Sequence, residues 1–288
     1  MVPAVLQRGR PAGDGDGDVT RAIDTWVNVN MAELGRPDYL VQVAGKYFKQ
    51  GEDFFRNYEI EEMLESMDAL GVTRAILTTD PYRPSEHVMK FAEKHPERFA
   101  LGAQLDPRRG MKALRALESF HASHPVVLAR ITPFYLDVAP NDAIYYPVYA
   151  KCIELDLPIT INTGIPGPPA PGECQHPMHL DKVCLHFPEL KLVMAHGADP
   201  WWSVAIRLML KYPGLHLMTS AYLPKYLPEE LLHFMRTRGR QKVIFASDHP
   251  AIQMDRCLEE ARQLDLPEEV LDGYLHGNAA RLFFGEER

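Results

Sequence analysis

Short apolar, β-branched runs alternate with segments of helical periodicity along most of the chain. Eight of these runs have the length of strands and lie at 22–27, 74–79, 99–105, 126–132, 158–163, 191–196, 215–220 and 242–248. Between them, apolar residues recur every three or four positions, as in the segment 60–70, which ends at Gly71. Strands that alternate with helices form a parallel sheet, because each helix returns the chain to the same edge.

The continuous series of eight strand–helix units predicts an α/β fold, a closed (β/α)8 TIM barrel. An open, doubly wound sheet is disfavoured because no dinucleotide-binding GxGxxG follows the first strand. No change in composition divides the chain of 288 residues, so a single barrel domain is expected over 21–288. The segment 1–20, which contains GDGDGD, is expected to be a disordered N-terminal tail.

Two connections, 31–58 and 164–177, are much longer than the others. Each follows a strand, so each is expected on the C-terminal face of the barrel, where barrel enzymes keep their active sites. Long loops in this position are usually lids or binding loops, and the alternative is a surface excursion without a function.

Several predicted strands end in polar side chains. Burying such a side chain costs free energy unless it is paired with another group or has a function. Asp248 closes the run KVIFASDHP at 242–250, and His196 follows KLVMA at 191–195. In a barrel the strand ends converge on one mouth. Four further polar or aromatic residues at strand ends complete the candidate site: Trp26, Asn28, Arg130 and Asn162.

These motifs resemble the amidohydrolase superfamily, specifically the amidohydrolase-related branch that includes the aminocarboxymuconate-semialdehyde decarboxylase-like enzymes. The markers are ID at 23–24, FPELKLVMAHGADPWW at 187–202, VIFASDHP at 243–250 and GNAARLF at 277–283. The resemblance runs from about Ile23 to Phe284. It implies a (β/α)8 barrel and the activity of a hydrolase or a carbon–carbon lyase.

The resemblance also implies metal ligands, and three of them are replaced in this chain. Members commonly read IDxHxH at the first strand, where Trp26 and Asn28 stand here; a shift by two residues places Asn28 and Asn30 there. The fifth strand usually ends in a histidine before Thr-Gly, and Asn162 takes that place. An indole does not bind zinc, and amides are weak, neutral ligands. We therefore expect no tightly bound zinc and no other cofactor. Four loop residues are alternative zinc ligands: Glu33, His176, His179 and His249.

Without a metal, the two residues that persist indicate acid–base chemistry. Asp248 is expected to act as a general base or to stabilise a developing cation. His196 is expected to donate or accept a proton near neutral pH. These two residues are the predicted catalytic pair.

The other four residues are predicted to bind the substrate. Asn28 and Asn162 are suited to hydrogen-bond a carbonyl or enolate oxygen, and Trp26 supplies an aromatic floor. Arg130 is suited to bind a substrate carboxylate through two parallel hydrogen bonds. Its alternative is a structural salt bridge to a barrel acid, Asp80 or Asp106.

The function expected is an amidohydrolase-related enzyme that acts on a small carbonyl or carboxylate compound, aromatic or polyketide-like. Hydrolysis, decarboxylation, and isomerisation or cyclisation by proton transfer all stay open. One alternative is a zinc-dependent hydrolase or non-oxidative decarboxylase that uses unrecognised ligands. Another is an inactive barrel that binds a small molecule or a partner.

Charge and composition narrow the range of partners. The net charge is −8 without any basic run, which argues against nucleic acid. No apolar stretch approaches the ~18 residues that span a membrane, and the first 20 residues lack the apolar core of a signal peptide. Four scattered cysteines indicate a reduced, cytoplasmic protein. The expected partner is a small-molecule substrate, and a homodimer is left open because barrels of this kind often dimerise.

Overall fold

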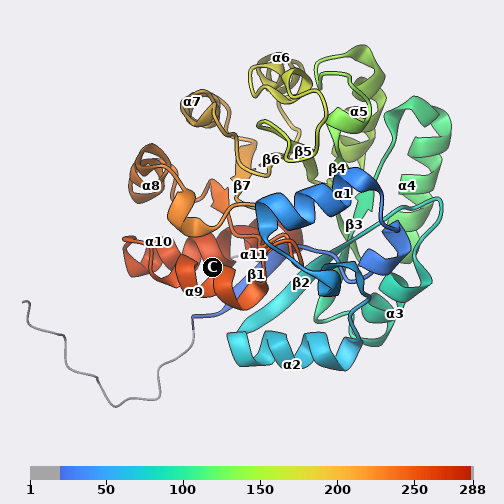
Figure 1. Ribbon diagram of the computed structural model, residues 1–288. Helices are drawn as coiled ribbons and strands as arrows, with labels where there is room; N and C mark the ends of the chain where they lie inside the picture. Colours follow the sequence, from blue (N-terminus) through green and yellow to red (C-terminus); the bar gives the residue numbers. More distant parts are fainter. Residues whose placement is uncertain (1–19, 287–288) are drawn as a thin grey trace, which may run out of the picture.

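Parallel strands form a barrel in which every strand pairs with its neighbour in sequence (Figure 1). The computed structural model describes residues 20–286, so nearly all of the expected N-terminal tail at 1–20 lies outside the described residues. The strands are β1 Ala22–Val27, β2 Val72–Thr79, β3 Phe99–Gln104, β4 Val126–Ile131, β5 Ile159–Asn162, β6 Leu192–Ala195, β7 Leu215–Met218 and β8 Val243–Ile244. Each lies within two residues of a predicted start.

The segment after β8 returns to β1 and brings the barrel close to full closure. The backbone nitrogen of Asn28 donates to the carbonyl oxygen of His249 at 2.8 Å, and that of Asp248 donates to Trp26 at 3.1 Å. Val27 and His249 form a parallel bridge. The predicted (β/α)8 TIM barrel, formed as a single domain, is therefore confirmed.

Helices between the strands form the outer layer (Figure 1). They are α2 Ile60–Leu70, α3 Glu86–Lys94, α4 Met111–Ser123, α5 Tyr146–Glu154, α6 His179–His186, α7 Trp202–Lys211, α8 Glu229–Arg236, α9 Met254–Arg262 and α10 Glu268–Asp272. As predicted, α2 ends at Gly71, which has a left-handed φ of 70° that costs glycine nothing. Within residues 20–286, no helix has both the length and the apolar character needed to cross a membrane.

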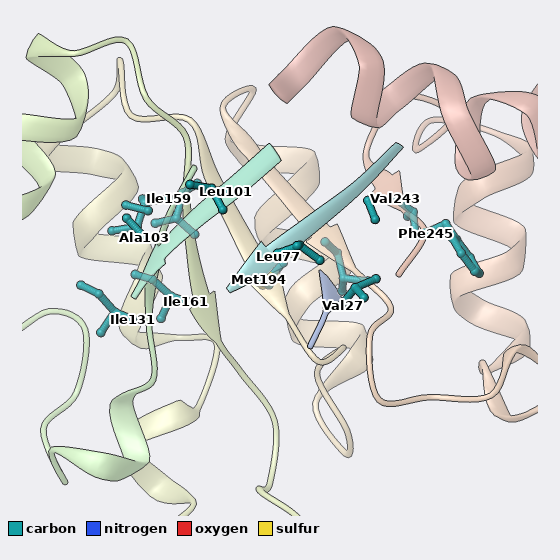
Figure 2. Packing of buried hydrophobic residues seen from close by; sticks show 14 of the residues in the cluster. Val27, Leu77, Leu101, Ala103, Ile131, Ile159, Ile161, Met194, Val243 and Phe245 are labelled. Carbon is teal, nitrogen blue, oxygen red and sulfur yellow. The ribbon is translucent and has the colours of Figure 1, made fainter. Parts of the chain in front are cut away.

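The core has two layers, because successive side chains of a strand point to opposite faces of the sheet. Strand residues such as Leu77 and Ile161 belong to the layer between the strands and the helices (Figure 2). A second cluster, which includes Ile76 and Val193, also contains residues of α11 Asn278–Phe284. Helix α11 contacts β1, β4 and β8, and Asn278 donates to the carbonyl oxygen of Val243 at the start of β8. The N-terminal end of the barrel is therefore closed, and the C-terminal end is left for the site.

Strand β8 is shorter than the predicted run at 242–248, because side chains and a neighbouring segment replace its ladder. The backbone nitrogen of Phe245 donates to Tyr274 at 3.0 Å. The backbone nitrogen of Ser247 donates to the carboxylate of Asp24 at 3.0 Å. Periodicity alone could not show that an acid on β1 would take the place of a strand carbonyl.

The first long connection, predicted as a lid, folds into short helices over the C-terminal end of the barrel. These are η1 Met31–Leu34, α1 Asp38–Val43, η2 Ala44–Phe48 and η3 Glu52–Phe55. We call residues 31–58 the cover segment. Met31, Ala44 and Phe54 pack with Ala251, which follows β8, and Gln50 donates to the carbonyl oxygen of Ala251 at 3.2 Å. The connection 164–177 is tied back on itself by a bond from Gln175 to the carbonyl oxygen of Gly164 at 2.8 Å.

Gly102 on β3 leaves the space that the side chain of Arg130 occupies, since a Cβ at this position would collide with Nε of Arg130. We expect Gly102→Ala to lower the free energy of unfolding by about 1–3 kcal/mol through overpacking, measured by urea denaturation. Gly45→Ala is the control, because a Cβ there meets nothing within 4 Å. Equal stability of the two variants would contradict the packing around Arg130.

Candidate active site

Trp26, at the end of β1, is the point where three predicted site residues meet. The guanidinium carbon of Arg130 lies 3.7 Å from the centre of the indole, and the ring of His196 lies 4.4 Å from it, centroid to centroid. The backbone nitrogen of Asp248 donates to the carbonyl oxygen of Trp26. Trp26 is only 7% exposed. The indole that was expected to contact the substrate therefore packs against an imidazole and a guanidinium of the protein itself.

Arg130, on β4, is a fully buried cation with 0% exposure. Its Nη2 donates to the carbonyl oxygen of Thr25 at 2.8 Å, whereas Nε and Nη1 have no hydrogen-bond partner among the described residues. Burial lowers the pKa of Arg130 to about 9, against the opposing effect of Asp248 and Asp24. These two carboxyls are therefore the counter-charges, and two of the guanidinium nitrogens are left for another acceptor.

The alternative salt bridge of Arg130 to Asp80 or Asp106 is not found in the part of the chain that the structure describes. Asp106 instead holds Arg108, with Nε to Oδ1 and Nη2 to Oδ2 both at 2.9 Å. Asp80 accepts a hydrogen bond from the backbone nitrogen of Tyr82 at 2.7 Å. Neither acid neutralises the guanidinium at the barrel mouth.

Asp24 is a buried acid whose place beside the site was not predicted. It is 0% exposed and accepts hydrogen bonds from the backbone nitrogen and the hydroxyl of Ser247 and from the backbone nitrogen of Trp26. Burial raises the pKa of Asp24 to about 6, although the bonds from Ser247 and the charge of Arg130 act in the opposite direction. The signal in the sequence was an acid in the middle of the apolar run AIDTWV.

Asp248 follows β8 with a left-handed backbone, φ of 67°, a conformation that non-glycine residues adopt at an energetic cost and often at functional sites. No hydrogen bond to its carboxyl group is found among the described residues. Burial raises the pKa of Asp248 well above its ordinary value; Arg130 opposes the shift and Asp24 adds to it. With hydrogen bonds supporting ionised Asp24 and none supporting ionised Asp248, Asp248 is the better proton carrier of the two.

His196 follows β6 and also has a left-handed φ, of 62°. Its backbone nitrogen donates to the hydroxyl of Ser220 at 3.1 Å, and its Nδ1 has no partner among the described residues. Burial, together with the charge of Arg130, lowers the pKa of His196 to about 3. The imidazole is therefore neutral at neutral pH, which favours a hydrogen-bonding or ligand role over the role of donating or accepting a proton that was expected from the sequence.

Asn162 and Asn28 bring amide groups to the same end of the barrel. Asn162, 4% exposed, pairs in register with Ala195 and so lies beside His196. Its Oδ1 is buried without a hydrogen-bond partner among the described residues. The Nδ2 of Asn28 makes a long bond, 3.4 Å, to the carbonyl oxygen of His249. Amide oxygens and a neutral imidazole are a donor set that a hard divalent cation such as Mn²⁺ accepts.

The alternative zinc ligands are not gathered around one point. Within residues 20–286 no group of three or more histidine, cysteine or acidic side chains is arranged to hold a metal ion. Glu33 accepts a hydrogen bond from Ser85, and His249 is buried with neither ring nitrogen bonded. His176 and His179 lie together in the loop after β5, with ring centroids 6.3 Å apart. A zinc cage of the usual nitrogen, sulphur and carboxylate ligands is thus not assembled by these residues.

The cover segment reaches across the mouth to the loop after β4. Tyr135 lies there, in η5 Pro133–Tyr135. Burial raises the pKa of the Tyr135 hydroxyl, and the hydroxyl of Tyr39 on α1 and the charge of Asp248 raise it further. Tyr39 therefore meets Tyr135 within electrostatic reach of the candidate acid, while both residues stay exposed, by 38% and 61%.

The fold and its polar mouth define an α/β barrel with the C-terminal site that is typical of barrel enzymes. The chain belongs to the amidohydrolase family, whose sequence pattern matches residues 23–285. This confirms the family that the motifs resemble. No curated protein matches the chain.

Several solved structures share the fold. An uncharacterised TIM-barrel protein from Bordetella bronchiseptica is 21% identical, with a TM-score of 0.76 over 91% of this chain and 98% of that one. A 5-carboxyvanillate decarboxylase from Sphingomonas paucimobilis is 19% identical, with a TM-score of 0.70 over 92% and 99%. A dihydroxybenzoic acid decarboxylase from Polaromonas is 18% identical, with a TM-score of 0.66 over 93% and 98%. At these identities the likeness establishes the fold alone.

The expectation that the barrel works without a metal cofactor is wrong. The decarboxylase from Polaromonas was crystallised with bound manganese and an inhibitor, which points to a metal cofactor that the zinc argument did not consider. That argument tested ligands for zinc, whereas manganese prefers oxygen donors and tolerates amides and water. The buried, unpartnered Oδ1 of Asn162 and the neutral His196 fit such an ion.

The raised pKa of Asp24 predicts a pH-dependent stability. Because the pKa is about 6 in the folded chain against 3.8 as the ordinary value, the folded state binds the proton more tightly than the unfolded state. That contribution is complete at low pH and is lost as the pH rises towards 6. We expect the unfolding free energy of the wild type, relative to Asp24→Asn, to fall by about 1.4 kcal/mol per pH unit between these values. Urea denaturation in chelator at several pH values measures it, and a difference that does not vary with pH contradicts the shift.

Proposed function

We propose that this chain is a non-oxidative decarboxylase that removes carbon dioxide from a hydroxylated aromatic carboxylate. The observation that carries the proposal is the pairing of Asp248, an acid with a raised pKa at the C-terminal end of the barrel, with the buried cation Arg130 within electrostatic reach of it. The names of two structural neighbours, 5-carboxyvanillate decarboxylase and dihydroxybenzoic acid decarboxylase, support the same reaction class.

The reaction needs a proton donor at a ring carbon, and Asp248 is suited to that role. Its proton passes to the ring carbon that bears the carboxylate, the carbon–carbon bond then breaks, and its electrons return to the ring as carbon dioxide leaves. The carboxylate of Asp248 regains its proton from water. A carboxyl whose pKa is raised holds this proton nearer to neutral pH than an ordinary aspartate does.

Arg130 and Trp26 have positioning roles in this scheme. The unpartnered Nε and Nη1 of Arg130 offer donors to an anionic oxygen of the substrate, in surroundings where such bonds are strong because water is excluded. The indole of Trp26 carries the guanidinium on its face and so fixes its direction. Both residues act on the substrate without exchanging a proton with it.

A divalent manganese ion would be held by neutral donors, the amide oxygens of Asn28 and Asn162 and the imidazole of His196. Bound there, it would supply positive charge to the carboxylate and hydroxyl oxygens of the substrate. The lowered pKa of His196 keeps the imidazole unprotonated and free to bind the ion. The amide nitrogen of Asn28 donates a long hydrogen bond to the protein backbone. This bond sets the orientation of the amide group.

We expect Asp248→Asn to reduce the release of carbon dioxide by about 100-fold or more, because an amide cannot transfer the proton. The substrates to test are 2,6-dihydroxybenzoate and 5-carboxyvanillate, and the product is measured by chromatography. Asp255→Asn is the matched control, since Asp255 is an exposed acid on α9.

Circular dichroism and thermal unfolding establish that Asp248→Asn keeps its fold. Unchanged turnover in this variant removes Asp248 from the mechanism. Cleavage of an ester or amide by the wild type, without release of carbon dioxide from any aromatic acid, identifies a hydrolase and overturns the proposed reaction.

Metal dependence is a second test. We expect chelation to abolish turnover and added Mn²⁺ to restore it. Asn162→Ala is expected to weaken Mn²⁺ binding by about 10-fold or more, because an oxygen ligand is lost. Titration followed by electron paramagnetic resonance measures binding independently of turnover. Asn141→Ala, in the surface loop before α5, is the control. The metal assignment fails if Mn²⁺ binds the wild type and Asn162→Ala equally well.

A further inference from the structure

The direction of the Asp248 side chain depends on the backbone that carries it. No hydrogen bond to its carboxyl group is found within residues 20–286, and its φ of 67° lies in the left-handed region, which costs free energy in any residue that has a Cβ. A carboxyl group that passes a proton to a substrate has to keep one direction. Contacts of the neighbouring residues are therefore needed to hold the chain in this conformation.

Ser247, the residue before Asp248, has a side chain that is 0% exposed and supplies such contacts. Its hydroxyl donates to Oδ2 of Asp24 on β1 and accepts from the backbone nitrogen of His249 at 2.9 Å. The second bond spans Asp248, because a serine oxygen that binds the amide two residues further on closes a tight turn. One side chain thus bends the chain around the candidate acid and ties it to β1.

The backbone of the same turn is held by β1, with one exception. The backbone nitrogen of Asp248 donates to the carbonyl oxygen of Trp26 at 3.1 Å, and that of Asn28 donates to the carbonyl oxygen of His249 at 2.8 Å. The exception is the amide of His249, whose acceptor is the Ser247 hydroxyl and not a strand carbonyl. Loss of this hydroxyl leaves a buried amide without its acceptor, which costs free energy.

Asp24 gives the Ser247 hydroxyl its orientation. A hydroxyl has one hydrogen to donate and two lone pairs to accept with, and the carboxylate of Asp24 takes the hydrogen. The lone pairs are then left for the amide of His249. The bond that bends the chain at Asp248 therefore depends on the buried acid of β1.

A second left-handed residue of the barrel mouth is held by a serine in a related way. His196 has a φ of 62°, and its backbone nitrogen donates to the hydroxyl of Ser220 at 3.1 Å. Ser220 is also 0% exposed. At the ends of β6 and β8, a buried hydroxyl thus takes the place of a strand carbonyl where the chain turns out of the barrel.

We propose that Ser247 is a positioning residue: its hydroxyl, oriented by Asp24, holds the turn 247–249 so that the carboxyl group of Asp248 keeps the direction in which it delivers a proton. The inference rests on the proposed function, because that proton transfer is the step that Ser247 serves. Ser247 is buried and does not touch the substrate. A residue with this role affects the rate of the chemical step and leaves substrate binding nearly unchanged.

Ser247→Ala removes the hydroxyl and tests the assignment by separating kcat from KM. We expect kcat for carbon dioxide release to fall by about 10-fold or more, because a misdirected acid transfers its proton slowly, with KM within about 3-fold of the wild-type value. The full, Mn²⁺-loaded chain is assayed with 2,6-dihydroxybenzoate and 5-carboxyvanillate. Ser247→Cys keeps a weaker donor and acceptor in the same place and should lie between Ser247→Ala and the wild type. It also replaces Ser247→Ala if that chain does not fold.

Hydrogen exchange is a second readout that does not need turnover. In chelator, the amide of His249 should exchange at least about 10-fold faster in Ser247→Ala than in the wild type, because its acceptor is gone. Nuclear magnetic resonance measures this rate for the single amide.

Thr219→Val is the matched control. The Thr219 hydroxyl is also buried and bonds the hydroxyl of Tyr274 at 2.7 Å, but no hydrogen bond of Thr219 to residues 247–249 occurs in the part of the chain that the structure describes. We expect this variant to keep the kcat of the wild type and the slow exchange at His249. Thermal unfolding compares the stability of the two variants.

The outcomes separate the positioning role from the reaction itself. An unchanged kcat in Ser247→Ala overturns the positioning role, as does an equal loss of kcat in Thr219→Val, which identifies a general loosening of the barrel. If the wild type releases no carbon dioxide from any aromatic acid, the decarboxylase is refuted and hydrogen exchange decides. Faster exchange at His249 in Ser247→Ala alone then supports the hold on the turn, and unchanged exchange overturns it.

Discussion

The burial of the Arg130 guanidinium against Trp26 is the constraint on which the site depends. A buried cation costs several kcal/mol unless opposite charge lies close by, and Asp24 and Asp248 are the groups that supply it. One cation faces two carboxyls, so the charges balance when one carboxyl is ionised and the other holds its proton. The hydrogen bonds from Ser247 and Trp26 favour ionised Asp24. The proton is therefore left on Asp248, the carboxyl that faces the mouth.

The same acid, Asp24, joins the electrostatics of the site to the closure of the barrel. Its carboxylate accepts hydrogen bonds from the backbone nitrogen and the hydroxyl of Ser247. Ser247 lies in the stretch after β8 where the regular hydrogen bonds between strands have ended. The hydroxyl of Ser247 in turn accepts a hydrogen bond from the backbone nitrogen of His249. The chain on both sides of Asp248 is thus held by the residue that compensates Arg130, so the position of the candidate acid and the charge beside it cannot vary independently.

The fold could be predicted from the sequence because each strand is a short apolar run and each helix repeats its apolar residues at helical spacing. The strand-end positions of Trp26, His196 and Asp248 followed from the fold, since parallel strands end at one mouth. The run 242–248 was expected to be one strand, and this was wrong after Ile244, because its partners there are the side chain of Asp24 and the backbone of Tyr274 in the helix η9 Gly273–Gly277. Periodicity carries no information on such partners.

The remaining parts of the site depend on contacts between loops, which no local pattern encodes. The contact of Tyr39 with Tyr135 joins α1 to the loop after β4, two segments far apart in the sequence. The metal expectation was wrong for a different reason: the ligands were judged against the preferences of zinc alone, whereas a neighbour of this fold holds manganese, an ion that accepts amide oxygens.

Burial gives the site its unusual protonation states, since it is the main cause of the raised pKa of Asp248 and of the lowered pKa of His196. The cover segment lies at the same end of the barrel, where Met31 and Phe54 pack on Ala251. Water admitted to the mouth would return both groups towards their ordinary titration. The protonated form of Asp248 is therefore favoured only where water is kept from the carboxyl, so exclusion of water from the mouth and readiness of the acid go together.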